Sequence, residues 1–236
     1  MRRLRLAAAL CMVAAGPLVL GGATNAPATR GQPLRADRGI KAYYLSRTER
    51  MVIDELNDAR RHPKKYAEYV RAYRARHRGG NTFADINGGL CQTVEGLPAV
   101  DEAIEFLLKK AKPAPELTPS WGLSDAAEDH VKDQGPKGAT GHDGSDGSAA
   151  KDRMSRYGAW QQVCGEIIAF GPEDARSMVV QWIVDDGVPG RGHRENIFND
   201  AFRRAGVAVG PHAKFRTMCV VDFAGDYAER TGKPKS

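Results

Sequence analysis

The sequence has few cysteines and no strong excess of charge. None of its four cysteines has the Cys-x-x-Cys spacing, which argues against a zinc ribbon and against thioredoxin-type redox chemistry. The formal net charge is +6, and about +3 remains without residues 1–28, which contain three arginines and no acid. Such a mildly basic chain does not indicate nucleic acid as a partner.

Long apolar runs are also scarce, since only one occurs, near the start of the chain. Residues 6–20 are apolar, arginines precede them, and small residues follow through Ala28. This pattern predicts a secretory signal peptide over 1–28, too short for a stable membrane span. We therefore expect a secreted or cell-envelope protein with no membrane span after cleavage. Polar residues 29–44 are predicted to form a linker.

The remaining sequence alternates between helical periodicity and short β-like segments. Helices are predicted over 46–60, 63–77, 97–108, 120–132, 149–157, 174–184 and 193–198. Strands are predicted over 162–170, 205–209 and 217–223, and loops over 78–93 and 135–148. Helices followed by a small sheet indicate an α+β domain with one core, over 45–228. The charged end, 229–236, is predicted to be a disordered tail.

Three cysteines lie beyond the predicted signal peptide: Cys91, Cys164 and Cys219. Export favours disulfides, and three cysteines allow one intramolecular bridge at most. Cys164 and Cys219 both lie in predicted strands, so a cross-strand disulfide between them is one interpretation. The alternative is that the thiols are buried and free.

The segment 185–198 is rich in residues that carry chemistry. It contains Asp185, Asp186, a glycine-rich turn and the sequence Gly-His193-Arg-Glu195-Asn. Two further candidates lie upstream, His142 in a polar loop and Glu166 in the first predicted strand of the sheet. Two histidines and two acids suit either a divalent metal ion or acid–base chemistry. They also suit a hydrogen-bonded network that only fixes loops around a cleft.

From 123 to 227 the chain resembles the CAP superfamily, also called the SCP domain, which includes cysteine-rich secretory proteins, antigen 5 and pathogenesis-related type 1 proteins. The resemblance rests on His142, on Gly-Glu166-Ile-Ile, on the Trp182 helix with Asp185, on Gly-His193-Arg, and on the final Val-Val-Asp-Phe. Asn57-Asp-Ala-Arg60 resembles the opening helix of bacterial members. The resemblance thus extends over about 45–227 and is most similar to an exported bacterial member.

This resemblance implies a three-layer α-β-α sandwich with a small antiparallel sheet and a cleft that holds four residues. The tetrad carried over to this chain is His142, Glu166, Asp185 and His193. The resemblance also implies zinc or another divalent ion on His142 and His193, with Glu166 and Asp185 as further ligand candidates. Animal members have Glu where this chain has Asp185, whose carboxylate reaches less far, so Asp186 competes for the fourth position.

Three neighbours are expected to support the tetrad, and Asp186 is one of them. Arg194 either holds carboxylates in the cleft by bidentate hydrogen bonds, which is the favoured interpretation, or faces solvent. Glu195 suits the first turn of a helix, where the helix dipole favours an acid.

Three functions remain open at this point. The favoured one is a non-enzymatic, exported binding module for a divalent ion or small apolar ligand, with a lipid or an extracellular or host component as partner. The second is a metal-assisted peptidase or esterase, in which Glu166 acts as general base. The third is a structural or adhesive surface domain. No activated nucleophile is visible, which favours binding over catalysis without deciding whether the protein is an enzyme.

Overall fold

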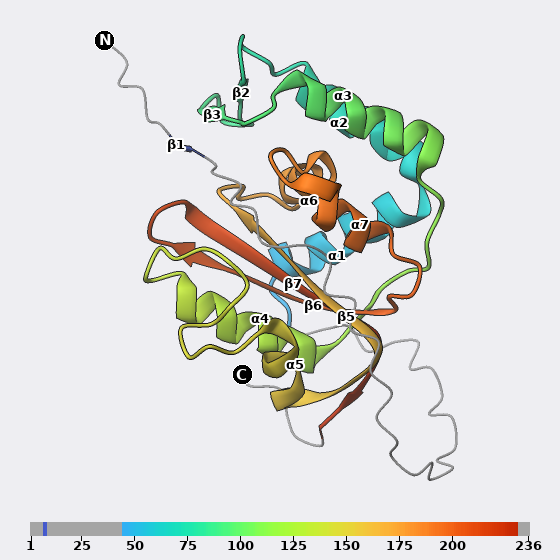
Figure 1. The fold of residues 1–236 in the computed structure, drawn as a ribbon, viewed down its shortest axis with the longest axis vertical. Helices are drawn as coiled ribbons and strands as arrows, with labels where there is room; N and C mark the ends of the chain where they lie inside the picture. The colour runs from blue at the N-terminus through green and yellow to red at the C-terminus, as the bar shows by residue number, and fades with distance from the viewer. Residues whose placement is uncertain (1–6, 9–43, 231–236) are drawn as a thin grey trace.

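The computed structural model describes residues 7–8 and 44–230 (Figure 1). The predicted signal peptide and linker therefore lie outside the described residues, except for Ala7–Ala8 and Tyr44. The predicted tail also lies outside them beyond Arg230, but Glu229 is the last residue of a strand. The first residue of the predicted tail thus belongs to β7.

Seven α-helices lie in the described ranges: α1 (Arg47–Arg61), α2 (Pro63–Arg74), α3 (Leu97–Glu105), α4 (Trp121–Gln134), α5 (Ala150–Tyr157), α6 (Ala175–Val184) and α7 (Gly192–Phe198). A π-helical turn (Phe106–Lys110) follows α3, and a 3-10 turn (Pro189–Arg191) precedes α7. The strands are β1 (Ala7–Ala8), β2 (Thr82–Ala84), β3 (Leu90–Gln92), β4 (Thr118–Pro119), β5 (Gly158–Phe170), β6 (Arg204–His212) and β7 (Arg216–Glu229).

Local sequence explains the paired helices at the start of the domain. Ser46 and Glu49 form a capping box at α1, with Glu49 N donating to Ser46 Oγ at 3.3 Å and Ser46 N donating to Glu49 Oε2 at 2.6 Å. Pro63 occupies the first position of α2, where its missing N–H leaves no helical hydrogen bond unmade. The predicted break between two helices is confirmed.

The main sheet has four strands in the order β4-β6-β7-β5. β7 runs antiparallel to both β5 and β6, and the short β4 is parallel to β6. A second sheet has the order β1-β3-β2. Its strands β2 and β3 form an antiparallel hairpin within 78–93, which the sequence predicted to be a loop. Each has only three residues, too few to show an alternating pattern.

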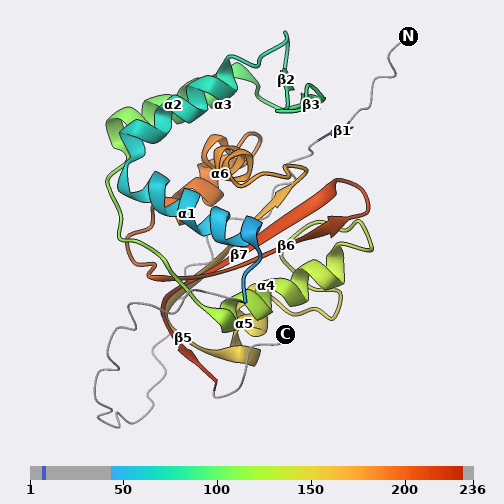
Figure 2. The same cartoon turned by 180° about the vertical axis from the view of Figure 1, so that it is seen from behind.

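Helices cover both faces of the main sheet, so the α+β sandwich is confirmed. Figures 1 and 2 show α4 and α5 on one face and α1, α6 and α7 on the other, with α2 and α3 packed outside α6. Alternate strand residues point to opposite faces. Accordingly, Val220 packs in the cluster with α4, whereas Val221 packs in the larger cluster on the other face.

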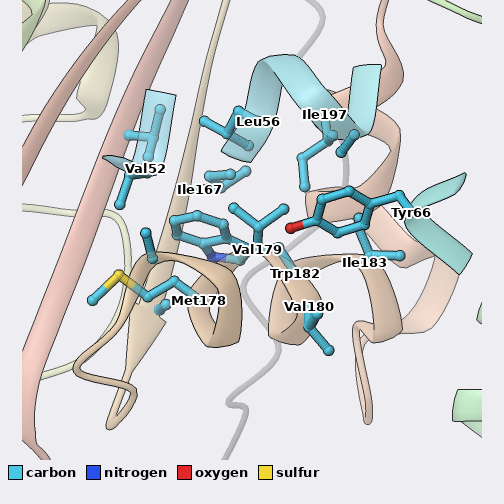
Figure 3. Packing of buried hydrophobic residues seen from close by; sticks show 14 of the residues in the cluster. Val52, Leu56, Tyr66, Ile167, Met178, Val179, Val180, Trp182, Ile183 and Ile197 are labelled. Carbon is cyan, nitrogen blue, oxygen red and sulfur yellow. The ribbon is translucent and has the colours of Figure 1, made fainter. Parts of the chain in front are cut away.

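The larger core lies between the sheet and α1, α2, α6 and α7. Figure 3 shows side chains from these elements converging on Trp182, which is 1 % exposed. Leu56 of α1, Ile167 of β5 and Ile197 of α7 are each fully buried in it. Because Trp182 is three residues from Asp185, this packing fixes the end of α6.

Gly206 allows α4 to lie directly against the sheet. A Cβ atom built at this position would lie 2.1 Å from the backbone carbon of Leu123 and 2.1 Å from the nitrogen of Ser124. No rotamer change relieves a clash with backbone atoms, so only glycine fits here.

The predicted disulfide is wrong. Cys164 is aligned with Ala224, and Cys219 is aligned with Ala169, in the β5–β7 ladder. The two cysteines are therefore offset by about 17 Å along the strands at ~3.4 Å per residue, and they point to opposite faces. A disulfide needs Cα atoms about 4.4–6.8 Å apart. Cys91, Cys164 and Cys219 are free, as in the alternative interpretation, but only Cys219 is buried as that interpretation expected.

Candidate functional site

The four predicted tetrad residues come together from four segments of the chain. His142 lies in the loop after α4, and Glu166 lies on β5. Asp185 ends α6, and His193 lies in the first turn of α7. The two imidazole rings face each other with centroids 6.5 Å apart and an angle of 36° between their planes.

Each histidine is paired with one carboxylate through Nδ1. The distance from His142 Nδ1 to Glu166 Oε1 is 2.7 Å, and that from His193 Nδ1 to Asp185 Oδ1 is 2.6 Å. The side chains of the acids are 2 % and 0 % exposed, whereas those of His142 and His193 are 32 % and 14 % exposed. The histidines thus reach solvent and the acids hold them from behind, which fixes each ring's orientation and leaves Nε2 as the acceptor.

Asp185, not Asp186, is the fourth member of the tetrad. It has a left-handed backbone (φ 54°) at the end of α6, which turns the chain towards α7. Its Oδ2 accepts hydrogen bonds from the backbone of His193 (2.9 Å) and of Arg194 (3.3 Å). The shorter carboxylate therefore caps the first turn of α7 and orients the His193 ring at the same time.

Asp186 points to a different structure, the start of α3. Its carboxylate accepts backbone hydrogen bonds from Val94 (2.5 Å), Glu95 (2.9 Å) and Gly96 (3.0 Å). Gly96 has no side chain to cap α3, so Asp186 supplies the anion at that helix N-terminus. It supports the tetrad by tying the turn after α6 to α3.

Arg194 is a buried support for the same turn, 2 % exposed. Its guanidinium donates two hydrogen bonds to Glu102 of α3, at 2.8 Å and 2.5 Å, and Nε donates to the Ile183 carbonyl at 2.7 Å. The hydrogen bond from Arg194 lowers the pKa of Glu102. The predicted bidentate contact is thus present, although the carboxylate belongs to α3 and not to the tetrad. Glu195 is exposed in the first turn of α7.

The other half of the tetrad depends on Arg153, which the sequence analysis missed. This α5 residue is 2 % exposed and donates to Glu166 Oε2 at 2.7 Å, to the His142 carbonyl at 3.0 Å and to the Ser148 carbonyl at 2.8 Å. It therefore holds both the carboxylate and the loop that carries His142. Nothing in the sequence distinguishes it from the exposed Arg156 on the same helix.

A second buried acid, Asp222 of β7, lies directly across the ladder from Glu166. It is fully buried, and among residues 44–230 no hydrogen-bond donor reaches either of its oxygens. Burial, and then the charge of Glu166, raise the pKa of Asp222 well above its usual value. For Glu166 burial acts in the same direction, but the hydrogen bond from His142 and the charge of Arg153 outweigh it and lower its pKa. The apolar strand around Asp222 was a signal that sequence reasoning passed over.

The tetrad contains two histidines, His142 and His193. Within the described part of the chain, no group of three or more His, Cys, Asp or Glu side chains is arranged to hold a metal ion. The carboxylates are turned towards the Nδ1 atoms, so the expected four-ligand set is not assembled. None of the helices in residues 7–8 and 44–230 has both the length and the apolar character that a membrane span needs.

Comparison with known proteins gives one family and two solved structures. The family model for the cysteine-rich secretory protein family (CAP) matches residues 53–223. An extracellular protein containing a SCP domain from Bacillus anthracis str. Ames has 22% identity and a TM-score of 0.41, covering 52% of this chain and 39% of that one. An outer surface protein from Borrelia burgdorferi has 20% identity and a TM-score of 0.39, covering 50% of this chain and 80% of that one. No curated protein matches the chain.

Proposed function

The chain belongs to the cysteine-rich secretory protein family, and on this premise we propose that it is an exported binding module that holds a divalent metal ion between His142 and His193. The observation that carries the proposal is the facing pair of imidazoles, each bound through Nδ1 to a buried carboxylate. A carboxylate on Nδ1 is the usual outer partner of a metal-binding histidine, because it fixes the tautomer and raises the basicity of Nε2. Export is supported by the predicted signal peptide.

Two imidazole nitrogens fit zinc or a similar divalent ion, with water or ligand groups at the remaining positions. Glu166 and Asp185 are less suited as direct ligands, since their oxygens are already engaged with histidines, Arg153 and backbone N–H groups. We therefore expect binding weaker than that of a four-ligand structural site. The polar atoms of the tetrad also favour an ion over an apolar ligand at this position.

The contacts of Glu166 favour binding over metal-assisted hydrolysis. A general base needs a free lone pair within reach of the attacking water. The Glu166 side chain is 2 % exposed and is held at 2.7 Å from His142 and 2.7 Å from Arg153, so its oxygens are turned away from solvent and from an attacking water. A purely structural role for the tetrad is the remaining alternative, and the experiment below separates it from metal binding.

Isothermal titration of the full chain with zinc tests the proposal. We expect one zinc per chain, and at least tenfold weaker binding in His142→Ala and in His193→Ala, with His62→Ala unchanged because His62 is an exposed histidine outside the tetrad. Binding should also weaken at acidic pH, since only neutral imidazole binds a metal. If wild type takes up no zinc while the tetrad variants lose thermal stability, the structural role is correct and this proposal is wrong.

A further inference from the structure

A cavity of about 290 Å³ lies beside α6, and none of the four tetrad residues lines it. One face of α6 forms its floor, with Ser177, Val180, Gln181 and Val184 at helical spacing. The C-terminal half of α2, the β2–β3 hairpin, the segment between β5 and α6, and the turn between β6 and β7 form its walls. Figure 1 shows this hairpin beyond α6, on the side of the molecule where that turn lies.

Aromatic rings line the cavity from two directions. Tyr69 and Tyr73 come from α2, and Phe170 and Phe215 come from the end of the sheet. The ring of Tyr73 is held by stacking on Phe83, with centroids 4.7 Å apart and planes 10° apart, and Phe170 and Phe215 are 5.6 Å apart. Fixed rings on two walls favour a flat aromatic ligand, which stacks on them or meets them edge-on.

Four acids and three arginines line this cavity, and among these charged side chains Arg76 is the one without a partner in residues 44–230. Every acid that lines it has a partner within the protein. Asp85, Asp174 and Asp186 accept hydrogen bonds from the backbone N–H groups of Asn87, Ser177 and Gly96, and Glu173 forms an ion pair with Arg216. Arg76 also lines the cavity and is half-buried. Its side chain makes no hydrogen bond or ion pair with another residue of 44–230. An anionic group on a ligand would give Arg76 the partner it lacks.

A buried acceptor without a partner also lines the cavity. The Nε2 atom of Gln181 donates to the Phe170 carbonyl at 3.4 Å, but its Oε1 atom is buried and receives no hydrogen bond within the described residues. Such an atom costs free energy unless a donor reaches it. Because the Oε1 atom is closed to solvent, a donor on a ligand would reach it only after the Gln181 side chain turned.

We propose that this cavity is a second binding site, separate from the tetrad, for a small aromatic carboxylate whose ring lies between the two aromatic walls and whose anion pairs with Arg76. The cavity volume is at the lower end of the range for ligand pockets, which suits one or two fused rings. The site goes beyond metal binding and does not depend on it.

Fluorescence titration of the full chain with 2-naphthoate tests the proposal, with 2-naphthalenemethanol and octanoate as comparison ligands. We expect saturable binding of 2-naphthoate at micromolar concentrations and binding of octanoate at least tenfold weaker. Arg76→Gln should weaken 2-naphthoate binding about tenfold and leave the neutral alcohol within about twofold. Arg78→Gln is the matched control, because Arg78 is exposed nearby and does not line the cavity.

A second variant tests the location. Ala72 is exposed on α2 and lines the cavity, so Ala72→Trp should fill its mouth and abolish 2-naphthoate binding while the protein keeps its melting temperature. Unchanged binding in Ala72→Trp would place the ligand elsewhere and overturn the assignment. Equal affinity for octanoate would overturn the aromatic ligand class, and absence of saturation up to about 1 mM would overturn the site itself.

Discussion

Replacing Arg153 with methionine should destabilise the protein strongly, because it leaves the buried Glu166 carboxylate without its cation. Both side chains of the pair are 2 % exposed, and their N–O distance is 2.7 Å. Removing one partner of such a pair costs about 3–5 kcal/mol. At about 2–4 °C per kcal/mol for a domain of this size, the melting temperature should fall by about 6 to 20 °C.

The measurement is urea unfolding followed by tryptophan fluorescence, with Arg156→Met as the matched control. Arg156 lies on the same helix, but its side chain is 42 % exposed and pairs with the surface acids Asp129 and Asp146, so its loss should cost at most about 1 kcal/mol. The double variant Arg153→Met with Glu166→Gln should recover at least half of the lost stability. Equal effects of the two methionine variants, or strict additivity in the double variant, would refute this reasoning.

Three further outcomes are expected. Asp222→Asn should stabilise the protein increasingly as pH rises from about 4 towards 7, because Asp222 must stay protonated when folded but ionises when unfolded; unfolding free energies across that range check the sign. Gly206→Ala should cost more than about 2 kcal/mol, through its clash with the backbone of α4, and clearly more than Gly210→Ala, which meets only a Val131 methyl group. Reductant should leave the melting temperature unchanged, as free thiols require; a decrease would indicate a disulfide.

Sequence patterns predicted the helices well because each buries one face. α1, α2 and α6 follow their apolar spacing to within a few residues, and Ser46 and Pro63 mark the starts of the first two. The strands were recognised but were predicted too short. At the end of β7 exposed residues such as Asp226 alternate with buried ones such as Tyr227, which packs with Leu123 and Met154. The strand continues as far as Glu229, where it pairs with the start of β5. Such pairing depends on a partner strand far away in the sequence.

The tetrad was predicted from the family resemblance and not from spacing, because its members come from segments up to about fifty residues apart. Arg194 and Asp186 were named from the sequence, but two other supporting residues were missed. Arg153 and Glu102 act through contacts between helices that have no local sequence pattern. Likewise, the sequence could not decide whether Asp185 or Asp186 is the fourth member of the tetrad. The left-handed backbone at Asp185 decides it, because it directs the Asp185 carboxylate to α7 and the Asp186 carboxylate to α3. The prediction of a disulfide between Cys164 and Cys219 was wrong because strand register, which has no local sequence pattern, decides which cysteines face each other.

The most direct test of the central claim is a crystal of the protein soaked with zinc and measured at the zinc absorption edge. The proposal predicts one anomalous peak between the two imidazole rings, about 2.0–2.1 Å from Nε2 of both His142 and His193. It also predicts that Glu166 and Asp185 keep their contacts with the Nδ1 atoms. Zinc found only at surface histidines such as His62, with the tetrad side chains unchanged, would contradict it.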